Sequence, residues 1–465
     1  MVSRARQQGL ALTPKELFEQ PVLKALAVQA VSAQASVIAQ QPLQGALPLL
    51  PIQQHFFSLN PPSPSHWNQH LWLALDAPME RPALEATLQA LYQQHDALRL
   101  QFTREQNGWT QTCLPADAPS HELLWWRQAP DDAAVSALCE QTQQSLNIEA
   151  GELFRVLYVQ TPQQPDRLLL VIHHLAVDGV SWRILLDDLL SAYGQALAGQ
   201  AITLPERTHN LGDWHQALVQ WLQNNGDERL PFWQAQQPDK ASAALPAYAE
   251  KQSATLSLDK ADTRRLLQDA PTKLGVSVPG LLLTALSRTL QSSAAGASLV
   301  ARSATVGNRA ASDASAENKN LVINLEGHGR ETRLAPGMDL SRTLGWLTSL
   351  YPVSLPFSDD PRQNLFAVSQ QLQQTEPDGG VGYGALRFLA DSALNDSPDA
   401  PVTFNYLGQY HDDALIQGFT PLRGGGTAQA GDNPMASPLA INGQVVGGQL
   451  AVSYTHLTLP TRRFV

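Results

Sequence analysis

The stretch that most restricts the fold is Asp166–Leu197, which reads DRLLLVIHHLAVDGVSWRILLDDLLSAYGQAL. Its apolar run from Leu168 to Ile172 is uninterrupted, as is typical of a strand buried on both faces. After a turn that contains Gly179, apolar residues recur at helical spacing, with Ser181 at the position of an N-cap. A buried strand that leads directly into an amphipathic helix indicates a layered α/β fold.

The rest of the chain repeats this mixture of elements. We expect strands at 70–76, 97–102, 320–327, 401–410 and 442–453, and helices at 81–95 and 277–291. The chain has 465 residues, of which 43% are hydrophobic, so it can form two cores of domain size. The fold class predicted from the residues is therefore α/β with two lobes.

Composition excludes several classes of protein. Charged residues make up only 16% of the chain, the net charge is −11, and no basic block is present, which argues against nucleic-acid binding. No apolar run is long enough to cross a bilayer, and the N-terminus lacks the apolar core of a signal peptide. Cys113 and Cys139 form no metal-ligand or CxxC pattern. We expect a soluble cytoplasmic protein.

Four segments stand apart from the predicted cores. Residues 1–30 are expected to form short helices, and residues 31–47, rich in Ala, Gln and Ser, a linker. Arg302–Asn320 is small and polar and is predicted to be a mobile surface loop. Ser453–Val465 begins with SYTHLTLPT, which resembles a translated sequencing adaptor, so we expect 453–465 to be an artefact.

The histidine pair is the first candidate site. Histidine exchanges protons near neutral pH, and a strand end before a turn would hold the ring rigidly. His173 and His174 are either core histidines with satisfied hydrogen bonds or a pair in which one transfers protons. Asp178 either caps the turn or braces it, and a buried carboxylate needs a partner, for which Arg99 is our candidate.

Two further motifs carry polar groups at strand ends. Glu326 follows the apolar LVINL and precedes two glycines; it is either a solvated turn residue or a desolvated carboxylate with a raised pKa. In FNYLGQY, alternation should place Asn405 and Tyr406 on opposite faces of a strand. Either side chain could bind a substrate carbonyl in a cleft, although a tyrosine packed in the core is the commoner arrangement.

The order of the motifs along the chain is more specific than any one of them. PIQQHFF at Pro51, HHLAVDGVSW, LEGHGRE, RTLGWLTSLYPVSL at Arg342, GGVGYG at Gly379 and FNYLGQY follow one another along the chain. Together they resemble the epimerization domain of nonribosomal peptide synthetases, a member of the condensation-domain superfamily, over Pro48–Val452. Residues 1–30 resemble the C-terminal part of a peptidyl carrier domain, whose phosphopantetheine-bearing serine would precede Met1.

The resemblance implies a fold and a domain division. It implies two chloramphenicol-acetyltransferase-like lobes that form a V-shaped pseudo-dimer with a central channel. The N-terminal lobe would span 48–225 and the C-terminal lobe 226–452, with the end of the second lobe missing after Val452.

The resemblance also implies an activity, inversion of the Cα of an aminoacyl or peptidyl thioester from L to D. No cofactor or metal would be bound by the domain itself. An upstream carrier domain would present the substrate on its phosphopantetheine arm, and the next module's condensation domain would follow; neither nucleic acid nor membrane is an implied partner.

The implied residues are His174 and Glu326 as catalytic, Asp178, Gly179, Trp182, Asn405 and Tyr406 as substrate-binding or supporting, and His173 and Arg99 as structural. The alternatives are a condensation domain that forms a peptide bond and a non-catalytic scaffold that docks carrier domains.

Overall fold

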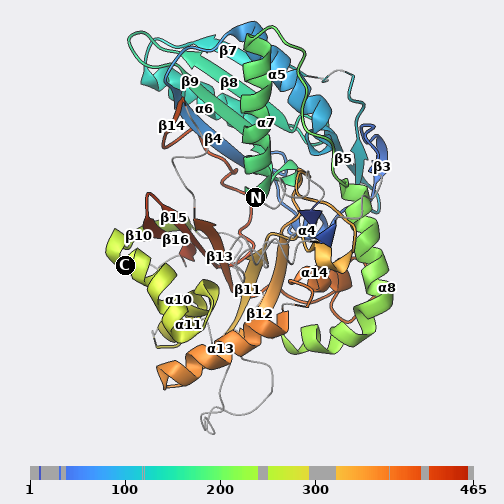
Figure 1. Ribbon diagram of the computed structural model, residues 1–465, viewed down its shortest axis with the longest axis vertical. Helices are drawn as coiled ribbons and strands as arrows, with labels where there is room; N and C mark the ends of the chain where they lie inside the picture. The colour runs from blue at the N-terminus through green and yellow to red at the C-terminus, as the bar shows by residue number, and fades with distance from the viewer. Residues whose placement is uncertain are drawn as a thin grey trace, which may run out of the picture.

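The computed structural model describes residues 10–11, 31–32, 38–117, 119, 121–238, 250–292, 321–375, 377–409 and 418–458. The predicted loop Arg302–Asn320 lies outside these residues, as does most of the predicted carrier fragment. Of the first 37 residues, Leu10–Ala11 (β1) and Val31–Ser32 (β2) are described, and they pair antiparallel. The two larger sheets lie in different lobes, one above the other in Figure 1.

The upper lobe is built on a sheet that is covered on both faces. Its strand order is β14-β4-β9-β8-β7, with β4 at Asn68–Leu75, β7 at Leu124–Gln128, β8 at Phe154–Gln160, β9 at Arg167–His173 and β14 at Phe419–Pro421. Helices α5 (Arg81–Gln94) and α7 (Gly179–Leu197) pack on one face, and α6 (Asp132–Gln144) packs on the other. Alternate residues of β9 enter the two cores, which confirms the strand predicted to be buried on both faces.

A small sheet and a short helix complete the N-terminal half. The sheet has the order β3-β6-β5, with β3 at Gly45–Leu47, β5 at Leu100–Glu105 and β6 at Gly108–Cys113. Strand β3 therefore uses the last residues of the predicted linker. Asp96–Arg99 forms a 3-10 turn (η1), so the strand predicted at 97–102 begins later, at Leu100. Helix α4, Pro51–Ser58, follows β3.

The lower lobe contains a sheet of order β10-β16-β15-β13-β11-β12. Its strands are β10 (Glu250–Ser257), β11 (Leu321–Gly327), β12 (Ser349–Leu355), β13 (Val402–Gln409), β15 (Leu439–Val446) and β16 (Gln449–Thr458). Strand β16 pairs with β10 and β15 and runs through Ser453–Thr458, within the suspected artefact. Helices α11 (Val278–Ser292) and α13 (Pro361–Thr375) pack on the sheet through one apolar core.

Several segments join the two lobes. Helix α8 spans Leu211–Ala235, so the predicted lobe boundary at 225/226 falls inside one continuous helix. Near α8 and α4, α14 (Val381–Phe388) contacts both helices and β12. Strand β14 comes from the C-terminal half of the chain but pairs with β4 of the upper sheet. The lobes are thus tied together at several places.

In the described part of the chain, the remaining short helical segments are η2 (His174–Ala176), α9 (Lys260–Arg264), the π-helical turn η4 (Arg265–Asp269), α10 (Ala270–Leu274) and η5 (Thr332–Leu334). Within the described residues, no helix combines the length and the apolar character needed to span a membrane.

Candidate active site

His173 is the last residue of β9, and its ring is completely buried. Its Nε2 donates to the carbonyl of Pro64 at 2.8 Å, and its Nδ1 accepts from the backbone N–H of Leu175 at 3.2 Å. Burial lowers the pKa of His173 to about 3, so the ring is neutral at physiological pH. With both nitrogens engaged by the backbone, His173 fixes the turn after β9.

His174 begins the next turn and is only partly buried. Its ring lies against Trp346, with 4.0 Å between ring centroids and 32° between planes. Its Nε2 lies 2.9 Å from the amide nitrogen of Gln69, whose oxygen accepts a hydrogen bond of 2.7 Å from the indole of Trp182. Burial lowers the pKa of His174, partly opposed by nearby backbone carbonyls and by Asp178. His174 is thus a neutral imidazole and suited to accept a proton.

Asp178 is both a helix cap and half of a buried ion pair. Gly179 is the first residue of α7, and Asp178 is its N-cap, accepting from the backbone N–H and the hydroxyl of Ser181. Ser181, which we expected to be the N-cap, instead donates hydrogen bonds to the N-cap residue, Asp178. The partner of Asp178 is Arg330, with bonds of 2.7 and 3.1 Å. Burial opposes ionisation of Asp178, but Arg330 and Ser181 outweigh it and hold its pKa below the usual value.

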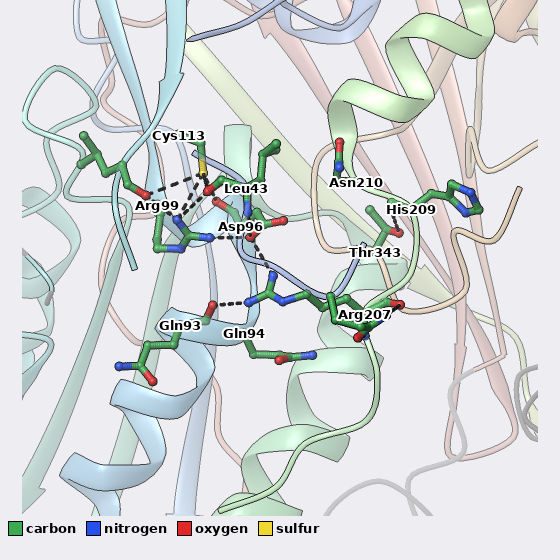
Figure 2. A network of polar contacts seen from close by, with 12 residues as sticks. Leu43, Gln93, Gln94, Asp96, Arg99, Cys113, Arg207, His209, Asn210 and Thr343 are labelled. Atoms are coloured by element: carbon green, nitrogen blue, oxygen red, sulfur yellow. Dashed lines mark hydrogen bonds and ion pairs between the residues drawn. The ribbon is translucent and has the colours of Figure 1, made fainter. Parts of the chain in front are cut away.

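Our expectation that Arg99 pairs with Asp178 is wrong. Arg99 is completely buried, and its guanidinium contacts Asp96, the carbonyls of Leu43 and Leu114, and the sulfur of Cys113 (Figure 2). Arg207 reaches the same oxygen of Asp96 at 2.8 Å. Since Arg99 comes directly before β5, its fixed backbone directs it to this cluster, and its environment is that of a structural residue.

The turn after β11 directs Arg330 toward Asp178. Gly329 has φ +67°, and a Cβ on it would lie 1.5 Å from the carbonyl oxygen of Leu347, so only glycine fits. Arg330 also donates to the carbonyl of Thr343 at 3.0 Å, and the N–H of Leu347 donates to Asp178 at 3.2 Å. The segment around Trp346 is thereby held against the start of α7.

Glu326 lies near the end of β11 and accepts a hydrogen bond of 2.6 Å from the side-chain amide of Asn405 on β13. Its carboxyl is accessible to water, but the surrounding protein desolvates it and raises its pKa to about 7, a rise that the charge of His55 partly opposes. Such a carboxyl can both accept and return a proton at neutral pH.

Asn405 and Tyr406 lie on opposite faces of β13, as alternation predicts. In the parallel pairing of β11 with β13, Leu325 lies opposite Phe404, which brings Asn405 beside Glu326. Tyr406 packs against the apolar core of the lower lobe with Phe404, and burial raises its pKa. Asn405 is therefore the member of the pair that contacts a candidate catalytic group.

Helix α4 contributes residues near both candidate groups. Phe56 makes ring contacts of 6.0 Å with both His173 and Trp346, on the side of His174. Its neighbour His55 is close enough to Glu326 to affect its pKa, and it bonds Asp399 at 2.9 Å. Beside α4, a small and mostly apolar pocket is lined by residues of α4, α8, β12 and α14. Among the described residues, no cluster of three or more His, Cys, Asp or Glu could hold a metal ion.

Sequence reasoning missed three residues at this site, namely Gln69, Arg330 and Trp346. Arg330 belongs to LEGHGRE and Trp346 to RTLGWLTSLYPVSL, so both lie in motifs that carry the family resemblance, although the predicted roles fell on other residues. Gln69, in the middle of β4, carries no comparable local signal.

A comparison with protein-family models assigns most of the chain to a family. A family model described as the condensation domain matches residues 43–317, more than half of the chain. A linear gramicidin synthase of Brevibacillus parabrevis is 35% identical over 481 residues, a match that covers 98% of this chain and 9% of that protein. The chain therefore spans a small part of the length of such relatives.

Comparison with solved structures supports the same fold. The epimerization domain from the third module of tyrocidine synthetase B is 29% identical, with a TM-score of 0.74, and the match covers 90% of this chain and 93% of that one. The X-domain from teicoplanin biosynthesis has a TM-score of 0.68 at 17% identity, covering 92% and 93% of the two chains. The predicted α/β fold of two chloramphenicol-acetyltransferase-like lobes is confirmed, and its sheets are not closed.

Proposed function

This chain belongs to the condensation domain family, and we propose that within it the chain inverts the α-carbon of an aminoacyl or peptidyl thioester. The substrate would be held on the phosphopantetheine arm of an upstream peptidyl carrier domain and passed to the condensation domain of the next module. The similarity at 29% identity to an epimerization domain supports this choice.

The observation that carries the proposal is the environment of Glu326. A carboxyl whose pKa is raised to about 7 is close to evenly divided between its acid and its base at neutral pH. The hydrogen bond from Asn405 orients it. Because inversion needs a group that takes a proton and a group that gives one, this property suits an epimerase.

His174 supplies the second group in the proposal. It comes from the upper lobe and Glu326 from the lower, and the contacts of Asp178 with Arg330 and of Trp346 with His174 bring their two motifs together. One group would remove the α-proton, and the electron pair of the broken C–H bond would pass into an enolate of the thioester. The other group would then protonate the opposite face, so that the net reaction neither gains nor loses atoms.

A condensation reaction is the second candidate, because the family model that matches is that of the condensation domain itself. That reaction would use His174 but would join two carrier-bound substrates. A scaffold that only docks carrier domains would use neither His174 nor Glu326 for chemistry.

One experiment distinguishes these functions. The full chain is mixed in deuterated buffer with separate carrier domains, each loaded with one of a panel of L-aminoacyl thioesters, without an acceptor. An epimerase exchanges the α-proton for deuterium and forms D-residues on at least one carrier. If every carrier keeps its α-proton and an added acceptor carrier is acylated, the chain is a condensation catalyst; if neither reaction occurs, it is a scaffold.

A further inference from the structure

We propose that Gln69 is a positioning residue which holds neutral His174 in the tautomer with its proton on Nδ1, so that Nε2 is the atom that takes the α-proton of the substrate. The choice of Nε2 as the base rests on the proposed function. The tautomer itself follows from the hydrogen bonds around Gln69 and can be tested without a substrate.

The orientation of the Gln69 amide is fixed by Trp182. An indole N–H can only donate, so the amide atom 2.7 Å from Nε1 of Trp182 must be the oxygen. If the amide were reversed, two N–H donors would face each other at that distance. The NH₂ group of Gln69 must therefore be the atom that faces His174.

That orientation in turn fixes the imidazole. The NH₂ group of Gln69 can only donate, and it lies 2.9 Å from Nε2 of His174. Nε2 must therefore accept with its lone pair, and the proton of the neutral ring must be on Nδ1. Nδ1 is buried and has no hydrogen-bond partner of normal geometry within the described part of the chain, and the backbone carbonyls of His174 and Val177 that act on the ring could only accept a proton from it, so no donor there reverses this assignment.

This arrangement has a consequence for proton transfer. Nε2 has a single lone pair, which accepts from Gln69 in the free protein, so the NH₂ group must leave Nε2 when the α-carbon arrives. The Cα–H bond then breaks, its electron pair remains on the substrate as the enolate, and the proton forms an Nε2–H bond. An imidazolium would place Nε2–H against the NH₂ group of Gln69, and Trp182 prevents the amide from reversing to receive it. Gln69 therefore favours the neutral ring and promotes return of the proton.

Few charged groups near His174 would counteract the preference of Gln69 for the neutral ring. Within the described residues, the titratable groups that act electrostatically on the ring are His173, which burial keeps neutral, and Asp178, whose charge is paired with Arg330. Trp346 covers one face of the ring and carries no charge. A charge placed at position 69 should therefore dominate the titration of His174.

The test is ¹⁵N NMR of histidine-labelled protein, in which His174 is identified by the signal lost in His174→Ala. The wild-type ring is expected to show the shift pattern of the Nδ1–H tautomer. In Gln69→Glu, the carboxylate can accept from both Trp182 and His174, so the neutral ring should change to the Nε2–H tautomer. The pKa of His174 should rise by about 1 to 3 units, as for an opposite charge at contact distance.

Gln101→Glu is the matched control, since Gln101 lies on β5 of the small sheet and its amide donates to the carbonyl of Glu149 and has no hydrogen bond to His174. It should leave the His174 signals unchanged.

Trp182→Phe keeps Gln69 but frees its amide to reverse, so this variant should give a mixture of His174 tautomers. It also provides the test if Gln69→Glu does not fold. A wild-type Nε2–H pattern, or a His174 pKa that does not respond to Gln69→Glu, would overturn the proposal. Absence of α-proton exchange in the wild type would refute only the proposed function.

Discussion

Asp178 and Arg330, which are 152 residues apart in the chain, form a buried two-point ion pair with N–O distances of 2.7 and 3.1 Å. Each follows its motif's candidate catalytic residue by four positions, Asp178 after His174 and Arg330 after Glu326. Both side chains are at most 7% exposed. The pair therefore fixes the two motifs relative to each other and lies outside bulk solvent.

We expect Asp178→Asn to destabilise the protein by about 3–5 kcal/mol, because it leaves the guanidinium of Arg330 buried without a charged partner. Thermal melting of the variant measures this loss. An unchanged melting temperature together with lost α-proton exchange would instead make Asp178 a direct participant in the chemistry.

The double variant Asp178→Leu/Arg330→Met serves as the control for this pair. Replacement of both partners by apolar residues removes the uncompensated charge, so the double variant should be more stable than either single variant. Strictly additive losses would show that the two residues do not act as a pair. The pKa of Asp178 is lowered in the folded state, so the wild type should lose this stabilisation as pH falls through that pKa.

His174→Ala should lower the rate of α-proton exchange by about 10²–10⁴-fold, the usual contribution of a positioned general base. Its melting temperature should change little, because the ring is only partly buried. His173→Ala is the matched comparison and should cost mainly stability, since it removes two buried hydrogen bonds. Full exchange in His174→Ala would contradict the assignment.

Glu326→Gln should cause a large loss of epimerization from both L- and D-loaded carriers, because the amide keeps the shape but cannot accept the proton. Chiral analysis of the released amino acid, started from each stereoisomer, measures this loss. Exchange that survives from one stereoisomer alone would assign His174 to that face. Unchanged rates from both would exclude Glu326 from proton transfer.

The same variant should change the pH dependence of stability. The folded state raises the pKa of Glu326 to about 7 from its ordinary 4.5, so between these values the folded state binds more protons than the unfolded state. The resulting stabilisation is present below the unfolded pKa and is lost as pH rises through about 7. Relative to Glu326→Gln, the wild type should therefore melt progressively lower as pH rises from about 4.5 to above 7. A constant difference in melting temperature would show that the carboxyl is not desolvated.

Asn405→Ala should move the pH profile of exchange to higher pH. The amide of Asn405 donates to the carboxylate of Glu326 at 2.6 Å and so stabilises its ionised form. Without that bond the pKa of Glu326 should rise further, and the carboxylate would form only at higher pH. The profile of the wild type, measured with the same loaded carrier, provides the reference; coincident profiles would show that the bond does not tune Glu326.

Local patterns predicted most of the elements that build the site. The apolar run of β9, the amphipathic stripe of α7 and the apolar strand before Glu326 each have a period or a composition that is readable in a short window. Alternation also predicted that Asn405 and Tyr406 would separate to opposite faces of β13. These properties depend on neighbours in sequence.

The partners of buried charges could not be predicted in the same way. Arg99 directly precedes β5 and Arg330 comes three residues after β11, and only tertiary packing directs one to Asp96 and the other to Asp178. The role of Gln69 depends on three segments that meet in space, β4, α7 and the turn after β9. The lobe boundary predicted at 225/226 falls inside α8, because a helix pattern gives no sign of which core each of its turns contacts.

The most direct test of the account is the fate of the α-proton on a single loaded carrier. The full chain is incubated in deuterated buffer with its aminoacyl carrier domain and no acceptor, and the released amino acid is analysed by mass and by chirality. We expect deuterium to replace the α-proton, a mixture of L and D isomers to form, and His174→Ala and Glu326→Gln to suppress this reaction. An L-residue that retains its α-proton while the same enzyme transfers it to an added acceptor would contradict the account.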